Sequence, residues 1–265
     1  MHPILFKLQW MGKEVVIGTY GVMMVAALAS GAALSLLVAR KRGYAPSEFV
    51  NYCMVIMAGV IIGALLAGFL LFLPERAGSG YIDHPTAWVS WGGILGGIGT
   101  LLYIKHAWHE SFLNLADIIT PGYMVGLGIG RIGCLFAGCC YGVHGTTCIA
   151  VTFTDPVAPA SAMVQPLVPT QLISAVFLIC AGLVLLPLAL KGGLKGFTFS
   201  LSAIIYSCFR FAIEFWRDDP RVFIANLSDG QVFSIGYFLM GMMIMIYLMK
   251  SSRSSPFSKL WRMEK

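Results

Sequence analysis

The sequence predicts an all-α integral membrane protein with about seven transmembrane helices. Of its 265 residues, 58% are apolar and only 11% are charged, and the mean hydropathy is +0.80. A soluble domain has about 45–50% apolar and about 25% charged residues, so the composition excludes a soluble globule. It also excludes a disordered chain, because so much apolar surface would not stay solvated. At about 20 residues for each span, the length holds roughly seven helices.

Apolar runs, and the charges or turn residues between them, place each span. The first run ends at the basic cluster 40–42, the second stops at the Pro-Glu-Arg sequence 74–76, and the third is rich in glycine and ends at Lys105. The fourth contains Asp117 and Pro121, so we expect it to be broken or kinked. In chain order, the expected spans are residues 16–39, 50–73, 88–104, 113–129, 169–190, 197–215 and 231–249.

We expect one polytopic membrane domain over residues 1–250, followed by a basic cytoplasmic tail over residues 251–265. If the connections alternate between two sides, the side with the C-terminus collects 11 Lys and Arg residues and the other side collects 6. The positive-inside rule then puts the C-terminus in the cytoplasm and the N-terminus outside. The connections 130–168 and 217–230 face outward too. The net charge of +6 therefore reflects cytoplasmic loops, and nucleic-acid binding is not expected.

Three ionisable residues near the end of the sixth span are the first candidates for function, because charges in a membrane are costly. Arg210 and Glu214 are four residues apart and Arg217 is three further on, so all three share one helix face. One interpretation is a self-neutralising ion pair that joins two helices. The other is an anion site, because an arginine fork matches the oxygens of a phosphate and keeps its charge when buried.

A glycine-rich stretch, residues 126–142, follows the fourth span and contains Arg131. Glycine at this density lets irregular backbone approach a lipid headgroup closely. The alternative is a close-packed interface of small residues between helices. Together with Arg210, Arg131 favours a site for an anionic headgroup.

Short motifs occur in order from about residue 19 to residue 249. G-R-x-G begins at Gly130, and F-R-x-x-x-E-x-x-R covers residues 209–217. The others are Tyr-Gly at 20–21, WGGILGG at 91–97, DIITP at 117–121, PTQL at 169–172 and GQVFS at 230–234. These motifs resemble those of the prolipoprotein diacylglyceryl transferase family, integral membrane enzymes that move diacylglyceryl from phosphatidylglycerol to a lipobox cysteine.

The resemblance implies a membrane transferase that takes diacylglyceryl from phosphatidylglycerol or a similar anionic phospholipid. It implies catalytic roles for Arg131, Arg210, Glu214 and Tyr20. Substrate-binding roles fall on Gly92, Gly93, Gly130, Gly133, Gly142, Gln171 and Arg217. It further implies a bacterial cytoplasmic (inner) membrane location and a prolipoprotein signal peptide as partner, with no cofactor or metal.

The departures from the family pattern fall on the chemistry. Trp91 stands where the family has a histidine, Cys134 where it has an asparagine, and Cys139 where it has an acidic residue. Leu65 and Val168 replace a further arginine and a further histidine. One hypothesis is therefore that the prolipoprotein reaction is lost or reduced, leaving a divergent enzyme with another acceptor or a non-catalytic phospholipid-binding or transport protein. The retained arginines disfavour a purely structural subunit.

Four of the seven cysteines, Cys134, Cys139, Cys140 and Cys148, cluster in the connection that is expected to face outward. Their spacing matches no standard zinc pattern, which disfavours a metal site. A disulfide in an oxidising compartment is favoured over a metal, and small-residue packing is the simplest alternative. The nearby His144, like His84 in another loop, is a candidate base, although most loop histidines are merely solvated.

Overall fold

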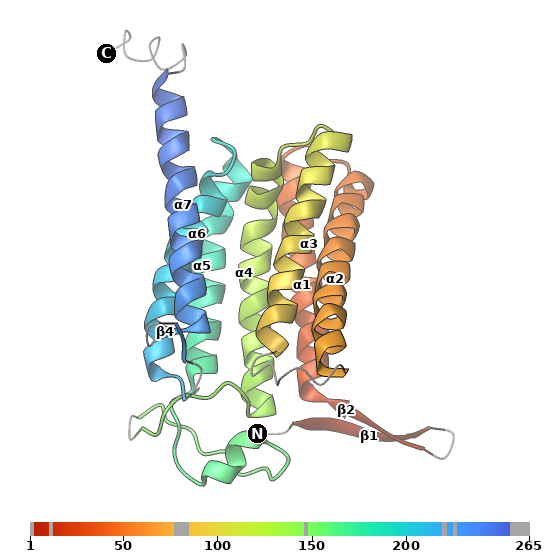
Figure 1. Ribbon diagram of the computed structural model, residues 1–265, viewed down its shortest axis with the longest axis vertical. Helices are drawn as coiled ribbons and strands as arrows, with labels where there is room; N and C mark the ends of the chain where they lie inside the picture. The colour runs from red at the N-terminus through yellow and green to blue at the C-terminus, as the bar shows by residue number, and fades with distance from the viewer. Residues whose placement is uncertain are drawn as a thin grey trace. The chain divides into compact units, whose positions relative to one another are not determined.

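The prediction of an all-α membrane protein is confirmed by the structure, a computed structural model that describes residues 3–10, 13–76, 85–145, 148–218, 222–224 and 227–254 (Figure 1). It contains seven long helices: α1 (Thr19–Lys41), α2 (Pro46–Arg76), α3 (Pro85–Ala107), α4 (Phe112–Ala137), α5 (Thr170–Lys191), α6 (Phe197–Ile213) and α7 (Asp229–Ser254). Within the described residues, six of these helices are long and apolar enough to cross a membrane, and α3 is the exception.

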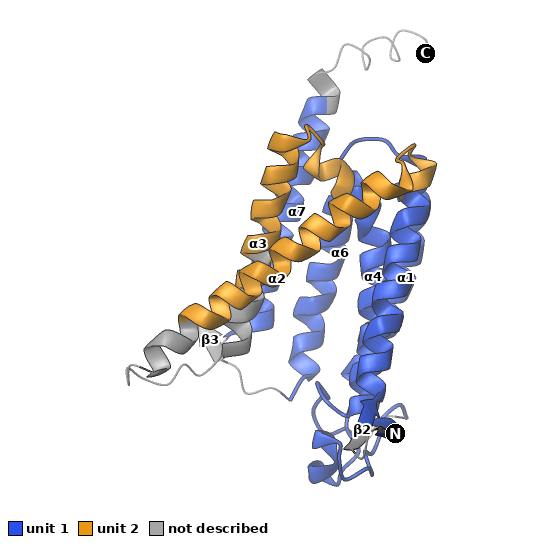
Figure 2. Cartoon of the chain, turned by 90° about the vertical axis from the view of Figure 1, so that its right-hand side faces the viewer, with its two compact units in different colours: residues 1–38, 117–265 blue, residues 39–116 orange. Residues whose placement is uncertain are grey.

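The chain divides into two compact units (Figure 2). The first, unit 1, comprises residues 1–38 and 117–265, and the second, unit 2, comprises residues 39–116. Unit 1 therefore contains most of α1 and α4 together with α5, α6 and α7, whereas unit 2 contains α2 and α3.

Glycines bring α2 and α3 of unit 2 into backbone contact. A Cβ atom on Gly96 would lie 3.0 Å from the Cα of Gly63, and one on Gly92 would lie 2.5 Å from the carbonyl oxygen of Gly63. Such close approach is possible only because glycine lacks a side chain, and it increases the dispersion contacts on which helix association in lipid depends.

Helix α4 packs between α1 and α5 in unit 1. On one side, a Cβ on Gly126 would lie 2.7 Å from the carbonyl oxygen of Ala27 in α1. On the other side, a Cβ on Gly128 would lie 3.0 Å from the carbonyl oxygen of Ala175 in α5. The packing interpretation of the glycine-rich stretch therefore holds for its helical part, and small residues let α4 approach both neighbours.

Of the break or kink expected in the fourth span, the break is wrong, because α4 runs without interruption from Phe112 to Ala137 with Pro121 inside it. Arg131 consequently lies on a helix and not on irregular backbone. A proline inside a membrane helix can be accommodated when neighbouring helices compensate. Here a Cβ on Gly182 of α5 would lie 3.0 Å from the carbonyl oxygen of Pro121, so α5 packs directly against this turn.

Asp117 has a structural role that its sequence position did not indicate. Its carboxylate accepts hydrogen bonds from the backbone N–H groups of Gly196, at 2.6 Å, and Phe199, at 2.8 Å. These groups lie at the start of α6, where four N–H groups of any helix lack partners within the helix. A side chain on α4 thus caps α6, and the positive end of the helix dipole stabilises the carboxylate, which is only 1% exposed.

Three connections of unit 1 gather at one end of its helices (Figure 1). The first is an antiparallel hairpin of β1 (Ile4–Trp10) and β2 (Lys13–Gly18), which the sequence did not predict. The second, residues 138–169, includes the short helix η1 (Pro159–Met163) and contributes to a small core. The third joins α6 to α7 and includes β3 (Val222–Ile224) and β4 (Leu227–Ser228). This common end agrees with the predicted alternation of the connections.

Candidate functional site

A small, partly open cavity inside unit 1 is lined by three arginines. Arg131 comes from α4 and Arg210 from α6. Arg217 follows the short helix η2 (Glu214–Trp216) and has extended backbone, so the expectation that it lies on the same helix face is wrong. We call this cavity the arginine cavity. Its other lining residues are Cys140, Thr170, Gln171, Ser174, Leu178, Tyr206, Phe209 and Ile213. The structure thus brings together Arg131, Arg210, Arg217 and Gln171, four of the residues that the sequence nominated.

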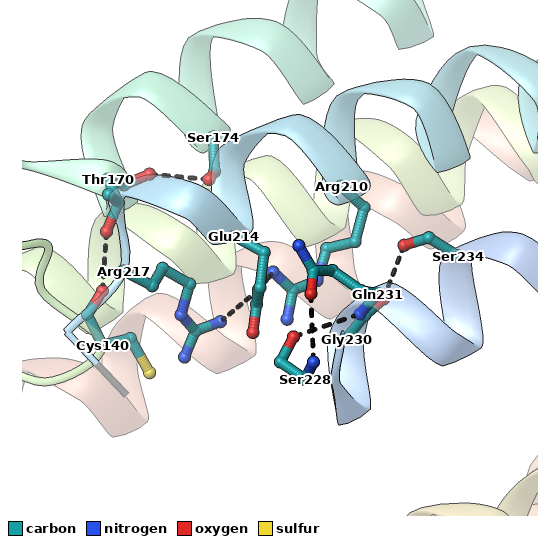
Figure 3. Close-up of polar contacts among 10 residues, drawn as sticks. All are labelled: Cys140, Thr170, Ser174, Arg210, Glu214, Arg217, Ser228, Gly230, Gln231 and Ser234. Atoms are coloured by element: carbon teal, nitrogen blue, oxygen red, sulfur yellow. Dashed lines mark hydrogen bonds and ion pairs between the residues drawn. The ribbon is translucent and has the colours of Figure 1, made fainter. Parts of the chain in front are cut away.

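Glu214 joins two of these arginines (Figure 3). Its Oε2 atom forms an ion pair with Nη1 of Arg210 and lies 3.9 Å from Nη1 of Arg217. All three side chains are largely buried, with 16%, 8% and 10% exposure for Arg210, Glu214 and Arg217. The ion pair and the anion site are therefore not exclusive alternatives, because one carboxylate orients the forks while three guanidinium groups keep the cavity positively charged.

Helix α7 supports the Arg210–Glu214 pair from the side. A Cβ on Gly230 would lie 2.6 Å from Nη2 of Arg210 and 2.9 Å from Oε2 of Glu214. The first turn of α7 is fixed by reciprocal caps, in which the Ser228 N–H donates to the Gln231 side chain at 3.0 Å and the Gln231 N–H donates to the Ser228 hydroxyl at 3.2 Å (Figure 3). This capping box holds Gly230 against the ion pair.

Gly142 positions the backbone of Arg217. The two residues form an antiparallel β-bridge, and the N–H of Val143 donates to the carbonyl oxygen of Trp216 at 2.9 Å. A Cβ on Gly142 would lie 2.5 Å from that oxygen and 2.8 Å from the carbonyl oxygen of Val168. A side chain at this position would therefore displace the segment that carries Arg217.

Two side chains at the start of α5 hold the turn that carries Cys139 and Cys140. Gln171 donates through Nε2 to the carbonyl oxygen of Cys139 at 2.7 Å, and the Thr170 hydroxyl donates to that of Cys140 at 2.9 Å. Gln171 is 1% exposed, and its Oε1 atom has no hydrogen-bond partner among the described residues. A buried acceptor without a hydrogen bond lowers the stability of the fold by about 1–3 kcal/mol, so a ligand in the cavity that donates a hydrogen bond to Oε1 would bind favourably.

The remaining nominated residues of unit 1 lie at the contact between α1 and α4. Tyr20 is 43% exposed, and its ring lies 3.4 Å from where a Cβ on Gly133 would be. A Cβ on Gly130 would meet Met24 at 3.7 Å. None of Tyr20, Gly130 and Gly133 lines the arginine cavity as the described residues define it, and their functional roles stay predictions.

Gly92 and Gly93 belong to unit 2, where both pack against α2. Close helix packing accounts for Gly92, whose Cβ would lie 2.5 Å from the carbonyl oxygen of Gly63, whereas a Cβ on Gly93 would make an ordinary contact with Val60 at 3.5 Å. Trp91, which precedes them, also lies in α3. Of the loop histidines, His144 is exposed with Nδ1 3.0 Å from the carbonyl oxygen of Pro166, and His84 lies outside the described residues.

Cys134, Cys139 and Cys140 form a cluster in which the three sulfur atoms all lie within 4.8 Å of one another. All seven cysteines of the chain are free thiols. Hydrogen bonds from the Cys134 and Cys139 thiols, with a smaller contribution from the positive charges of Arg217 and Arg131, lower the pKa of Cys140 far below its ordinary value. The hydrogen bond to Cys134 raises the pKa of Cys139. The cluster thus favours one thiolate, at Cys140, which faces the arginine cavity.

Sequence reasoning did not nominate Thr170, Ser174 or Tyr206, all of which line the cavity. Thr170 and Ser174 are four residues apart on α5, and the Ser174 hydroxyl donates to the Thr170 carbonyl oxygen at 2.6 Å (Figure 3). Their spacing could have indicated that both line the same site, because residues four apart on a helix share a face. Tyr206 gave a similar signal, since it precedes Arg210 by four residues.

This fold and cavity define a multi-pass α-helical membrane protein with a buried, positively charged site. The model of the prolipoprotein diacylglyceryl transferase family matches residues 3–247. The chain belongs to the prolipoprotein diacylglyceryl transferase family.

Relatives of similar length bear the family's name. The phosphatidylglycerol–prolipoprotein diacylglyceryl transferase 2 of Clostridium perfringens is 35% identical over 236 residues, covering 85% of this chain and 89% of the relative. The phosphatidylglycerol–prolipoprotein diacylglyceryl transferase of Clostridium tetani is 35% identical over 255 residues, covering 92% and 96%. That of Dehalococcoides mccartyi is 32% identical over 269 residues, covering 98% and 97%.

Proposed function

We propose that this chain is a transferase that moves diacylglyceryl from phosphatidylglycerol to the cysteine thiol of a prolipoprotein. The observation that carries the proposal is the convergence of Arg131, Arg210 and Arg217 on one buried cavity, in a chain of the prolipoprotein diacylglyceryl transferase family. A cavity with three guanidinium groups suits a phosphate, because each fork can donate two parallel hydrogen bonds to its oxygens.

The reaction requires a thiolate to attack the glyceryl carbon that is bonded to phosphate. A carbon–sulfur bond then forms, the carbon–oxygen bond breaks, and glycerol 1-phosphate leaves with the electron pair. Negative charge grows on the leaving phosphate, so Arg131 and Arg210 would stabilise the transition state more than the bound lipid. Arg217 adds a third cation to the same cavity.

Glu214 acts in this scheme as a positioning residue. Its ion pairs with Arg210 and Arg217 fix both guanidinium groups before the lipid arrives, which lowers the entropy lost on binding. Gln171 can accept a hydrogen bond from a glycerol hydroxyl through its unpaired Oε1 atom. Tyr20 with Gly133 beside it, and Gly130 next to Met24, would face the lipid from the contact between α1 and α4.

We also propose a location and an orientation. The enzyme lies in the bacterial cytoplasmic membrane as one membrane domain over residues 1–250, with the basic tail 251–265 in the cytoplasm and the N-terminus outside. The excess of Lys and Arg on the C-terminal side supports this orientation. The outward end would then receive the acceptor, a prolipoprotein signal peptide with its lipobox cysteine.

The test is incubation of the purified protein with labelled phosphatidylglycerol and a lipobox peptide, followed by mass analysis of every product. We expect the peptide to gain a diacylglyceryl group and glycerol 1-phosphate to appear in equal amount. A matched peptide with serine in place of the cysteine is the control and should stay unmodified. Release of glycerol phosphate without modification of the cysteine peptide would indicate another acceptor.

A second candidate function is phospholipid binding without transfer, and Trp91 favours it. An indole donates one hydrogen bond but cannot serve as a base near neutral pH, whereas the histidine of the family pattern can exchange a proton. Expression in a bacterium depleted of its own diacylglyceryl transferase separates the two functions. Full rescue of growth and lipoprotein labelling would rule out the binding-only function, and lipid binding without rescue would favour it.

A further inference from the structure

We propose that Cys134, Cys139 and Cys140 form a three-thiolate site for a thiophilic metal ion of the Zn²⁺ class, whose open fourth position takes the acceptor thiol. This inference rests on the proposed transferase function, and the metal ion would supply the means of ionising the acceptor thiol. Transfer needs an ionised acceptor thiol, and the histidine of the family pattern is Trp91 here. A metal ion ionises a coordinated thiol outright.

The positions of the three sulfur atoms fit a single ion. They all lie within 4.8 Å of one another, and three sulfurs bound at about 2.3 Å in a tetrahedral arrangement are about 3.8 Å apart. Side-chain rotations that move each sulfur by about 0.6 Å would shorten a separation of 4.8 Å to about 3.8 Å, the separation found around one ion. Three protein ligands with an open position are the arrangement of reactive zinc sites, whereas purely structural sites have four.

The turn at the C-terminal end of α4 brings the three cysteines together. Gly138 follows the last residue of α4 and has a φ of +69°. The N–H of Cys139 donates to the carbonyl oxygen of Cys134 at 3.2 Å, and the N–H of Gly138 donates to the carbonyl oxygen of Leu135 at 3.2 Å. These two bonds form a Schellman motif, which folds Cys139 back over Cys134. Cys140 then takes φ +59°, a conformation that costs a non-glycine residue energy and turns its backbone again.

The turn is held in this shape from α5. The buried side chains of Thr170 and Gln171 donate to the carbonyl oxygens of Cys140 and Cys139, at 2.9 and 2.7 Å. These two bonds fix the backbone from which two of the three sulfur atoms project. The cluster is therefore a constrained set of ligands and not three thiols on a mobile loop.

Charge favours an occupied site. Three thiolates and one divalent cation carry a net charge of −1, and Arg131 and Arg217 lie close enough to interact electrostatically with Cys140. Cys140 also lines the arginine cavity, so an acceptor bound at the open position would lie beside the phosphate site. The nucleophile and the leaving group would then occupy neighbouring positions, as an in-line displacement needs.

The chemistry balances without an oxidant. The three cysteines release their protons to solvent when the metal binds, and the acceptor thiol releases its proton when it takes the fourth position. The bound thiolate attacks the glyceryl carbon, glycerol 1-phosphate leaves, and the neutral thioether dissociates because it is a much weaker ligand than the thiolate. The metal keeps its charge and its three cysteines throughout.

The first experiment titrates the full-length, reduced protein with Co²⁺, a spectroscopic probe for zinc sites. We expect one Co²⁺ per chain, with sulfur-to-metal charge-transfer absorption that Zn²⁺ abolishes. Cys140→Ser and Cys134→Ser should weaken binding about 10-fold or more, and Cys148→Ser is the matched control because Cys148 is exposed and lies outside the cluster. Absence of charge-transfer absorption in the wild-type protein, or a disulfide within the cluster of the active protein, would overturn the proposal without any variant.

The second experiment adds a lipobox peptide to the Co²⁺ protein. A change in the cobalt spectrum with the cysteine peptide, but not with its serine counterpart, is expected, and equal spectra would overturn the acceptor position. Transfer should fall about 10-fold or more in metal-free protein and recover with Zn²⁺, because only a few per cent of a free thiol is ionised at neutral pH. Undiminished transfer by metal-free protein would overturn the inference and leave the proposed function intact. A cysteine-dependent spectral change without transfer under any condition would support the site and overturn the proposed function.

Discussion

At the scale of the residue, the geometry of the arginine cavity depends on two glycines that let backbone segments pack closely. Gly230 lets the first turn of α7 lie directly against the Arg210–Glu214 pair, and Gly142 lies directly against the backbone carbonyl oxygens of Trp216 and Val168, next to Arg217. The resemblance nominated Gly142 as a substrate-binding residue, whereas no role was predicted for Gly230. The structure assigns them to packing that positions charged groups.

Replacing Gly230 with alanine should weaken phosphatidylglycerol binding about 10-fold. The new methyl group would lie 2.6 Å from Nη2 of Arg210, so the guanidinium group has to move away from its position in the cavity. The measurement is retention of labelled lipid by the protein in nanodiscs. Gly236→Ala on the same helix is the control, because nothing lies within 4 Å of its Cβ position. Equal binding by both variants would contradict the positioning role.

The arginine cavity also predicts a difference between arginine and lysine. Arg131→Lys and Arg210→Lys should each weaken phosphatidylglycerol binding about 10- to 100-fold, because a hydrogen bond to a charged group is worth about 1.5–3 kcal/mol and lysine cannot bind two oxygens in parallel. The exposed Arg40, which does not line the cavity in the described structure, supplies the control Arg40→Lys. Unchanged lipid binding by well-folded cavity variants would refute the phosphate role.

At the scale of the element, α4 organises unit 1. Its glycines contact α1 on one side and α5 on the other, Asp117 near its start caps α6, and its last turn leads into the cysteine turn. Arg131 lies between these contacts and is therefore held by a rigid helix. The expected irregular backbone begins only at Gly138, after the helix ends.

Replacing Asp117 with alanine should lower the free energy of unfolding by about 2 kcal/mol. The variant leaves the N–H groups of Gly196 and Phe199 without their acceptor, and caps of this kind contribute about 0.5–2 kcal/mol, with more when the donors are buried. The measurement is denaturant unfolding in detergent. Asp155→Ala is the control, because its carboxylate accepts a solvent-exposed bond from the N–H of Val157 at 3.0 Å. Similar losses for both variants would contradict the buried-cap interpretation.

At the scale of the whole molecule, the connections of unit 1 alternate between two ends of its helices. The hairpin of β1 and β2, residues 138–169 and the connection from α6 to α7 share one end (Figure 1). The arginine cavity contains residues from both sides of the Gly138 helix end, so it lies near this end. In the proposed orientation, this end is the one that an acceptor from outside the cell would reach.

Reporter fusions at Lys265 and within the connection 217–230 should report opposite sides of the membrane, with Lys265 in the cytoplasm. The reason is the excess of Lys and Arg on the side of the C-terminus. Alkaline phosphatase and green fluorescent protein fusions measure the two sides, since each is active on only one of them. Both positions on the same side would contradict the predicted orientation.

Much of the fold was predictable because it depends on residues that are close in the chain. A run of about 20 apolar residues predicts a span wherever it occurs, and the observed helices match the expected spans apart from their ends. The longest discrepancy is α4, which continues to Ala137 because helix packing tolerates its glycines and Pro121. The hairpin of β1 and β2 was missed, because a short segment beside the first span gave no clear pattern.

By itself, the sequence determined the membrane class, the approximate spans and the pairing of Arg210 with Glu214 four residues on, since hydropathy and helical periodicity are local properties. The tertiary structure alone decided that Arg131 and Gln171 meet Arg210 in one cavity, because these residues come from three different helices. It also decided the meeting of the cysteines. Their spacing matches no metal pattern, but two left-handed residues at a helix end bring the three sulfurs together, and such turns are set by packing and not by spacing.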